Sequence, residues 1–211
     1  MSAVMKAILN AGGLIAPILW AVTIIYCGSY HPEYSHYRQF VSELGERGSS
    51  TENLMWSGAF VLPGLMIVGF GLLLLDMFRH SKVAIGAAVL LVLSGIGQIG
   101  AGVFPCDPGG MPVDPSFSQM VHYVAAVLTM LCLIAAGFLC FITAPKVLCS
   151  RWFRWYALIS AVSGLLFLLM LWAAILSGES IGLFQRLSLG VLYLWVLVLS
   201  VMVWRLRSIL R

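Results

Sequence analysis

Six long apolar runs make up most of this 211-residue chain and constrain its fold more than any other feature. They cover residues 8–28, 54–77, 83–103, 121–143, 155–176 and 187–204. Each run is close to the ~20 residues that an α-helix needs to cross the ~30 Å hydrocarbon layer of a bilayer. Because that layer contains no water, each segment must pair its own backbone N–H and C=O groups, as a helix does. The sequence therefore predicts an all-α, polytopic membrane bundle of six transmembrane helices, forming a single domain over residues 1–211.

The distribution of basic residues predicts the orientation of these helices, because Lys and Arg favour the cytoplasmic side of a membrane. Only Arg38, Arg47 and Arg186 fall in the odd-numbered loops. The other nine fall at the termini or in the even-numbered loops: Lys6, Arg79, Lys82, Lys146, Arg151, Arg154, Arg205, Arg207 and Arg211. Both termini are therefore predicted to be cytoplasmic and the odd-numbered loops to lie outside. Basic residues confined to helix ends also argue against nucleic acid as a partner, despite the net charge of +4.

The first outer loop has helical periodicity between residues 33 and 44. Its apolar residues Tyr34, Tyr37, Val41 and Leu44 recur at spacings of three and four residues, which places them on one helix face. The glycines that follow are typical stop signals. We therefore expect a short amphipathic helix at the membrane interface, which either caps the outer mouth of the bundle or rests on lipid head groups.

Small residues dominate the third apolar run between positions 94 and 102, which permits close approach of neighbouring membrane helices. Gly97 and Ala101 share a face and are expected at such a contact, in a helix near the centre of the bundle. Gln98 is a buried amide that needs partners, either as a packing contact or as part of a pocket. In the second run, Pro63 removes a backbone donor and crowds the carbonyl of Ala59, which predicts a kink.

The five cysteines indicate little about function. Cys27 and Cys106 both lie on the predicted outer side, where a disulfide between them is one alternative and two ordinary buried thiols are the other. Cys149 is expected to be cytoplasmic and reduced.

Polar residues that can take part in catalysis or binding lie at the predicted outer ends of the helices. Asp107 directly follows the third helix, and His122 begins the fourth after a loop rich in proline and glycine. Successive turns in such a loop can bring Asp107 and His122 together. Arg186 enters the sixth helix from outside, where its partner is either a phosphate or carboxylate ligand or an internal acidic residue.

Several of these residues lie in short motifs that resemble a family of six-helix bacterial and archaeal membrane proteins, the domain of unknown function 998. The motifs are Ser42-Glu43-Leu44-Gly45, Asn53, Gly102-Val103-Phe104-Pro105-Cys106-Asp107, His122 and Gly182-Leu183-Phe184-Gln185-Arg186-Leu187. Their order follows the helices along nearly the whole chain. The resemblance implies the six-helix fold and a location in the cytoplasmic (inner) membrane of a bacterium or archaeon. It implies no particular activity.

Three classes of function fit these features. The first is a hydrolase or transferase that acts on a lipid or other amphiphile, with Ser42 as nucleophile, Asp107 as orienting acid and His122 as base. His122, Asp107 and a further His or Glu could instead hold a metal that activates water. The second is a non-catalytic binder, sensor or transporter, although the lack of charge near the helix centres argues against an ion pathway. The third is a scaffold for other membrane proteins.

The most specific prediction is a single polar pocket roofed by the loop helix. It brings together Ser42, Glu43, Asp107, His122 and Arg186, with Arg186 binding an anionic group. The predicted substrate contacts are Glu43, Asn53, Gln98, Gln185 and Arg186. No motif identifies a resident cofactor, metal or oligomeric state, and a membrane lipid or an amphiphilic ligand is the expected partner.

Overall fold

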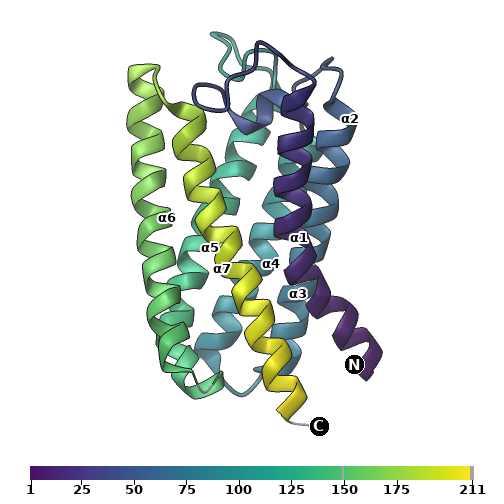
Figure 1. Ribbon diagram of the computed structural model, residues 1–211, viewed down its shortest axis with the longest axis vertical. Coiled ribbons are helices and arrows are strands. Elements are labelled where there is room, and N and C mark those ends of the chain that lie inside the picture. The colour runs from purple at the N-terminus through teal and green to yellow at the C-terminus, as the bar shows by residue number, and fades with distance from the viewer. Residues whose placement is uncertain (149, 210–211) are drawn as a thin grey trace.

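The structure, a computed structural model, describes residues 1–148 and 150–209, and only the backbone of residues 145–147 and 209. The expectations for Cys149 and Arg211, and for the side chain of Lys146, lie outside this description. Six helices in the described part are long and apolar enough to cross a membrane, and no strand occurs among these residues. The chain is therefore an all-α, multi-pass membrane protein (Figure 1).

The spanning helices are longer than the apolar runs. They are α1 (Ala3–Ser29), a continuous second helix made of α2 (Glu52–Leu54), η2 (Met55–Val61) and α3 (Leu62–Met77), then α4 (Lys82–Val103), α5 (Phe117–Val147), α6 (Arg151–Ser177) and α7 (Ile181–Ile209). Serine hydroxyls that accept a backbone N–H begin α1, α4, α5 and α6, at Ser2, Ser81, Ser116 and Ser150. These caps lie outside the apolar runs, so hydropathy alone placed most helix starts too late.

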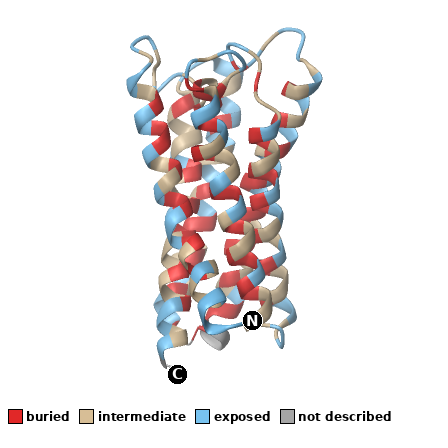
Figure 2. Ribbon diagram, turned by 90° about the vertical axis from the view of Figure 1, so that its right-hand side faces the viewer, coloured by how far each residue is buried: buried red, intermediate tan, exposed pale blue. Residues whose placement is uncertain are grey.

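The helices form a ring in which each packs against its neighbours in sequence, and α1 closes the ring against α7. Buried residues line the inside of this ring (Figure 2). The contacts of α4 with other spanning helices are made mainly to the second helix and α5, so its predicted central position is wrong. Both termini lie at one end of the bundle, called here the terminal end; the loops after α1, α4 and α6 form the opposite loop end (Figure 1).

The predicted close contact of α4 is confirmed, on both of its flanks. A Cβ added to Gly97 would lie 2.8 Å from the carbonyl oxygen of Ala125 in α5. On the other flank, a Cβ on Gly95 would lie 2.6 Å from the carbonyl oxygen of Gly64 in α3. Such distances leave no room for a side chain, so glycine permits the two neighbouring backbones to approach.

The second helix contains a π-helical segment, η2, just before Pro63. Proline has no N–H, so the carbonyl of Ala59, four residues earlier, loses its normal helical donor. The wider turn is closed by a bond from the Leu62 N–H to the carbonyl of Ser57, five residues back. Gln98 of α4 donates its Nε2 to the free Ala59 oxygen at 2.8 Å. At the position where the sequence predicted a kink, the structure has a π-helical segment whose free carbonyl is satisfied by a side chain from the adjacent helix.

The amphipathic helix predicted over residues 33–44 does not form at that length. Residues 32–39 make turns, and only Val41–Gly45 is helical, as the short 3-10 helix η1. Side chains take the backbone partners that a longer helix would need: Gln39 Oε1 accepts the Ser35 N–H, and Tyr34 donates to the Phe40 carbonyl. Of the four residues on the predicted apolar face, Val41 and Leu44 are buried, whereas Tyr37 is 53% exposed, so the periodicity identified the buried residues only in part.

Candidate functional site

Two hollows meet at the loop end, and both are lined by His122. The inner cavity, about 40 Å³, lies inside the helix ring and has Ser42, Gln98, Gln185 and Tyr193 among its lining residues. The lateral groove, about 400 Å³, lies between the second helix and the ends of α4 and α5. Its lining residues are Gly45, Glu52, Asn53, Trp56, Phe60, Ala101, Gly102, Val103, Pro105 and His122. Trp56 and Val103 are each about half exposed, at 47% and 52%, so the groove opens on the side of the bundle.

His122 is held in one orientation by backbone oxygens. Its Nδ1 lies 2.8 Å from the carbonyl oxygen of Ala101 and 2.9 Å from that of Phe104. Carbonyl oxygens only accept, so Nδ1 carries the proton and, in the neutral ring, Nε2 is a free acceptor. Ala101 lies in the last turn of α4, where carbonyl oxygens have no helical donor, and Pro105, four positions later, has no N–H to offer. The end of α4 thus fixes the tautomer of His122.

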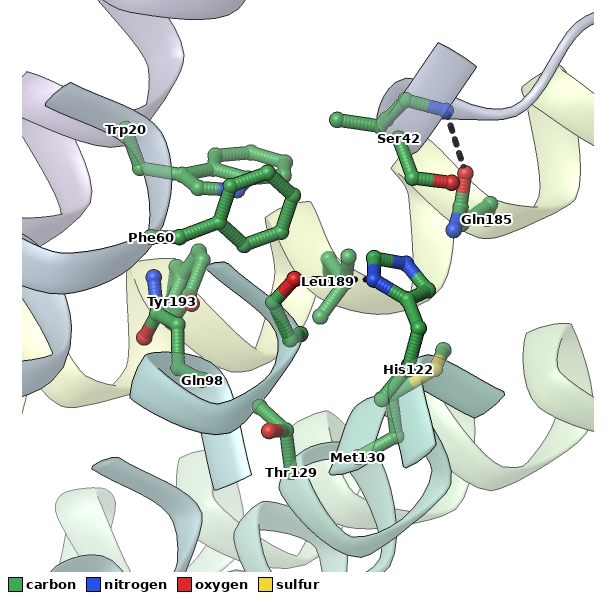
Figure 3. Close-up of a pocket in the computed structure, with 13 residues that line it drawn as sticks. Trp20, Ser42, Phe60, Gln98, His122, Thr129, Met130, Gln185, Leu189 and Tyr193 are labelled. Carbon is green, nitrogen blue, oxygen red and sulfur yellow. Dashed lines mark hydrogen bonds between the residues drawn. The ribbon is translucent and has the colours of Figure 1, made fainter. Parts of the chain in front are cut away.

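Ser42 and Gln185 lie on the side of the inner cavity that the free nitrogen of His122 faces (Figure 3). The Val41 N–H donates to Gln185 Oε1 at 2.6 Å, which ties η1 to the start of α7. The side chain of Ser42, which is only 8% exposed, hydrogen-bonds with the Cys106 thiol. The buried Gln98 Oε1 has no partner among the described residues. The inner cavity therefore contains an amide oxygen that needs a donor, and it has room for a few water molecules.

Asp107 does not pair with His122, contrary to the prediction. Its two carboxylate oxygens accept the N–H and the hydroxyl of Ser116, both at 2.8 Å. These hydrogen bonds hold the pKa of Asp107 below its usual value. The Asp107 N–H in turn donates to Oε1 of Gln119, and Nε2 of the same glutamine donates to the Gly110 carbonyl. Asp107 and Gln119 thus fold the proline-rich loop onto the start of α5, and backbone carbonyls take the orienting role at His122.

Arg186 is not arranged as an anion clamp. Its Nη1 donates to the backbone oxygens of His36 at 2.8 Å, Gln39 at 3.0 Å and Gly182 at 2.9 Å. Its Nη2 donates to the hydroxyl of Tyr34, and the guanidinium lies 5.5 Å from the centre of that ring. Arg186 therefore binds the first loop to α7. No acidic side chain among the described residues forms a salt bridge with it.

Glu43 also supports the loop rather than a ligand. Its Oε1 accepts the Phe40 N–H and its Oε2 accepts Gln39 Nε2, both at 2.8 Å. Asn53 is exposed and lines the lateral groove, with no side-chain hydrogen bond to another described residue. The predicted single pocket is thus divided. Ser42, Gln98, Gln185 and His122 share the inner cavity, Asn53 and His122 share the groove, and Glu43, Asp107 and Arg186 hold the loops.

The described cysteines are free thiols. Cys27 and Cys106 are buried free thiols, so the disulfide considered from the sequence is not formed. Burial raises the pKa of Cys106 to about 12, and its Sγ donates to the Ser42 carbonyl at 3.1 Å. No group of three or more His, Cys, Asp or Glu side chains among the described residues is placed to hold a metal ion.

Three residues that organise the loop end were not identified from the sequence: Tyr34, Thr51 and Gln119. Burial raises the pKa of Tyr34 to about 12, so its hydroxyl remains protonated and donates to the Phe40 carbonyl at 2.7 Å. Thr51 donates to the Leu44 carbonyl and is also bonded to His31. Gln119 is fully buried three residues before His122. The signal available in the sequence was the position of Gln119, one helical turn before the candidate His122.

Fold and site together define a multi-pass membrane protein with a polar inner cavity and a lateral groove that meet at a backbone-anchored histidine. A family model described as a protein of unknown function, DUF998, matches residues 14–202. The chain therefore belongs to the DUF998 family, as its motifs indicated. No curated protein and no solved structure matches the chain.

Proposed function

We propose that this protein binds one amphiphile from the bilayer in the lateral groove, with the polar end of the ligand at His122. The observation that carries the proposal is a hollow of about 400 Å³ that opens at the side of the bundle and has Asn53 and His122 in its wall. That volume lies within the range of ~300–1,000 Å³ typical of ligand sites.

The other lining residues support an amphiphile rather than a soluble molecule. Trp56, Phe60 and Val103 provide apolar walls suited to an acyl chain, whereas Asn53 adds a polar amide that has no side-chain hydrogen bond to another described residue. The groove is open at the side of the bundle, where the half-exposed Trp56 and Val103 would face lipid. A ligand can therefore enter sideways from the bilayer without crossing the helix ring.

A groove-filling substitution tests this proposal. Val103→Trp adds an indole to the groove wall without burying it in the core, and Val89→Trp places the same group on α4 at a site that is 41% exposed and outside the groove. Native mass spectrometry of gently extracted protein should show one bound amphiphile in the wild type and in Val89→Trp, reduced at least tenfold in Val103→Trp. Absence of a bound amphiphile from the wild type, or equal retention by both variants, would contradict the proposal.

A second candidate function, acyl hydrolysis or transfer, is favoured by the arrangement of Ser42 and His122. His122 Nε2 would take the proton of the Ser42 hydroxyl while the Ser42 oxygen attacks the carbonyl of a lipid ester. The released alkoxide takes that proton from His122 and leaves as an alcohol, with the acyl group on Ser42. Water or a second alcohol then attacks the acyl-serine, passes its proton through His122 and restores Ser42.

Labelling with a fluorophosphonate probe discriminates binding from chemistry, because such probes react with activated serines. Covalent labelling at Ser42 that is absent from Ser42→Ala would support the second function. If the wild type retains its amphiphile but is not labelled, the result would contradict the catalytic function and support binding.

The orientation in the membrane belongs to the same proposal. The nine-to-three division of Lys and Arg supports cytoplasmic termini and a loop end facing outward from the cytoplasmic (inner) membrane of a bacterium or archaeon. A reporter that is active only outside the cytoplasm should work when fused at Asp114 and fail when fused at the C-terminus. The opposite pattern would place the groove at the cytoplasmic surface.

A further inference from the structure

The lateral groove has an unusual charge balance for a lipid site, because its lining contains a carboxylate and no Lys or Arg. Glu52 lies at its edge, where Oε2 accepts the Gly48 N–H at 2.7 Å. The other polar lining side chains are Asn53 and His122. The Glu52 carboxylate accepts hydrogen bonds, and the Asn53 amide both accepts and donates them, so the groove offers a ligand hydrogen-bonding groups and one negative charge.

The arginines at the loop end do not compensate for this balance. Arg186 is bound to backbone oxygens and to Tyr34, and Arg47 lies 3.9 Å from the Asp107 carboxylate. Neither of them lines the groove, and nor does Arg38. A phosphate placed there would lose water without gaining a cationic partner and would be repelled by Glu52.

From these groups we infer that the groove selects an uncharged, hydroxyl-bearing head group, as in a monoacylglycerol, and rejects the same lipid bearing a phosphate. This inference rests on the proposed amphiphile-binding function and adds the chemical class of the ligand. Glycerol hydroxyls can donate to the Glu52 carboxylate and to the Asn53 carbonyl, whereas a phosphate adds negative charge beside Glu52. The single carboxylate at the groove edge therefore sets the selectivity.

A matched pair of ligands tests the inference: 1-oleoylglycerol and 1-oleoylglycerol 3-phosphate, which differ only in the phosphate. Each is titrated against delipidated wild-type protein in a neutral detergent and followed by native mass spectrometry. We expect the neutral lipid to bind at least ~10-fold more tightly, which corresponds to about 1.4 kcal/mol. Equal or tighter binding of the phosphate form would overturn the head-group assignment and leave amphiphile binding intact. Binding of neither lipid would contradict both proposals.

Charge reversal at the groove edge completes the test. Glu52→Lys replaces the repulsive carboxylate with a cation and should remove or invert the preference for the neutral lipid. Glu33→Lys makes the same change in charge at an exposed loop residue that does not line the groove, and it should leave the preference unchanged. An identical change in both variants would mean that the overall charge of the loop end, rather than Glu52, determines selectivity.

Discussion

Replacing Arg186 with methionine is expected to lower the melting temperature of the detergent-solubilised protein by roughly 5–10 °C. The substitution keeps an unbranched chain but removes the donors to three backbone oxygens and to Tyr34. Each unsatisfied buried acceptor costs about 1–3 kcal/mol. Because water has partial access to this part of the loop, we expect the sum over these acceptors to be only about 2–4 kcal/mol. Thermal unfolding followed by tryptophan fluorescence measures the effect.

The comparison with Arg186→Lys separates a structural role from an anion-binding role. Lysine retains the charge but cannot reproduce the planar fork that reaches His36, Gln39 and Gly182, so this variant should also be destabilised. Arg38→Met, in the same loop but exposed, is the matched control and should melt close to the wild type. An unaltered melting temperature in Arg186→Met, together with weakened binding of an anionic ligand, would restore the anion-clamp interpretation.

The other large effect is expected from Gly97→Leu. The new side chain would begin with a Cβ 2.7 Å from Thr129 Oγ1 and 2.8 Å from the Ala125 carbonyl oxygen, so α4 and α5 must separate. Overpacking of this kind costs about 1–3 kcal/mol or more, and separation of two backbones places it at the upper end. The melting temperature in detergent should therefore fall, again by roughly 5–10 °C.

Gly190→Leu provides the control for the change in helix propensity and hydrophobicity. It lies in α7, and a Cβ built there meets no atom within 4 Å. This variant should melt within a few degrees of the wild type. Equal loss of stability in the two variants would show that glycine itself, and not the tight contact of α4 with α5, explains the effect.

The sequence predicted the fold well because the relevant signal is physical and repeated. Six apolar runs of spanning length leave the backbone no alternative to helices, and small residues around Gly97 indicated the close contact correctly. The order of the helices around the ring was harder, since a run of small residues shows that a helix packs tightly but not how many neighbours it has. The central position expected for α4 failed for that reason.

The candidate site was predicted only in part, because sequence position places a residue at a helix end but does not decide its partner. Ser42 and His122 do line one cavity, whereas Asp107 found a nearer donor in Ser116, nine residues along the chain. Arg186 bound backbone oxygens that become available only when the first loop folds into turns. The sequence indicated that a helix ends near Pro105, but only the fold shows that His122 donates to the Ala101 carbonyl at that end.

The π-helical segment η2 also determines the direction, around the axis of the second helix, in which the groove residues Glu52 and Asn53 lie. A π-helical turn holds one residue more than an α-helical turn, and each residue advances an α-helix by about 100°. Glu52 and Asn53 are therefore rotated by roughly that angle from where an unbroken α-helix continuing back from Met77 would carry them. Loss of a single residue from η2 would turn the polar edge of the groove toward a different neighbour, with every side chain unchanged. The number of residues before Pro63 thus matters to the site as much as their identity.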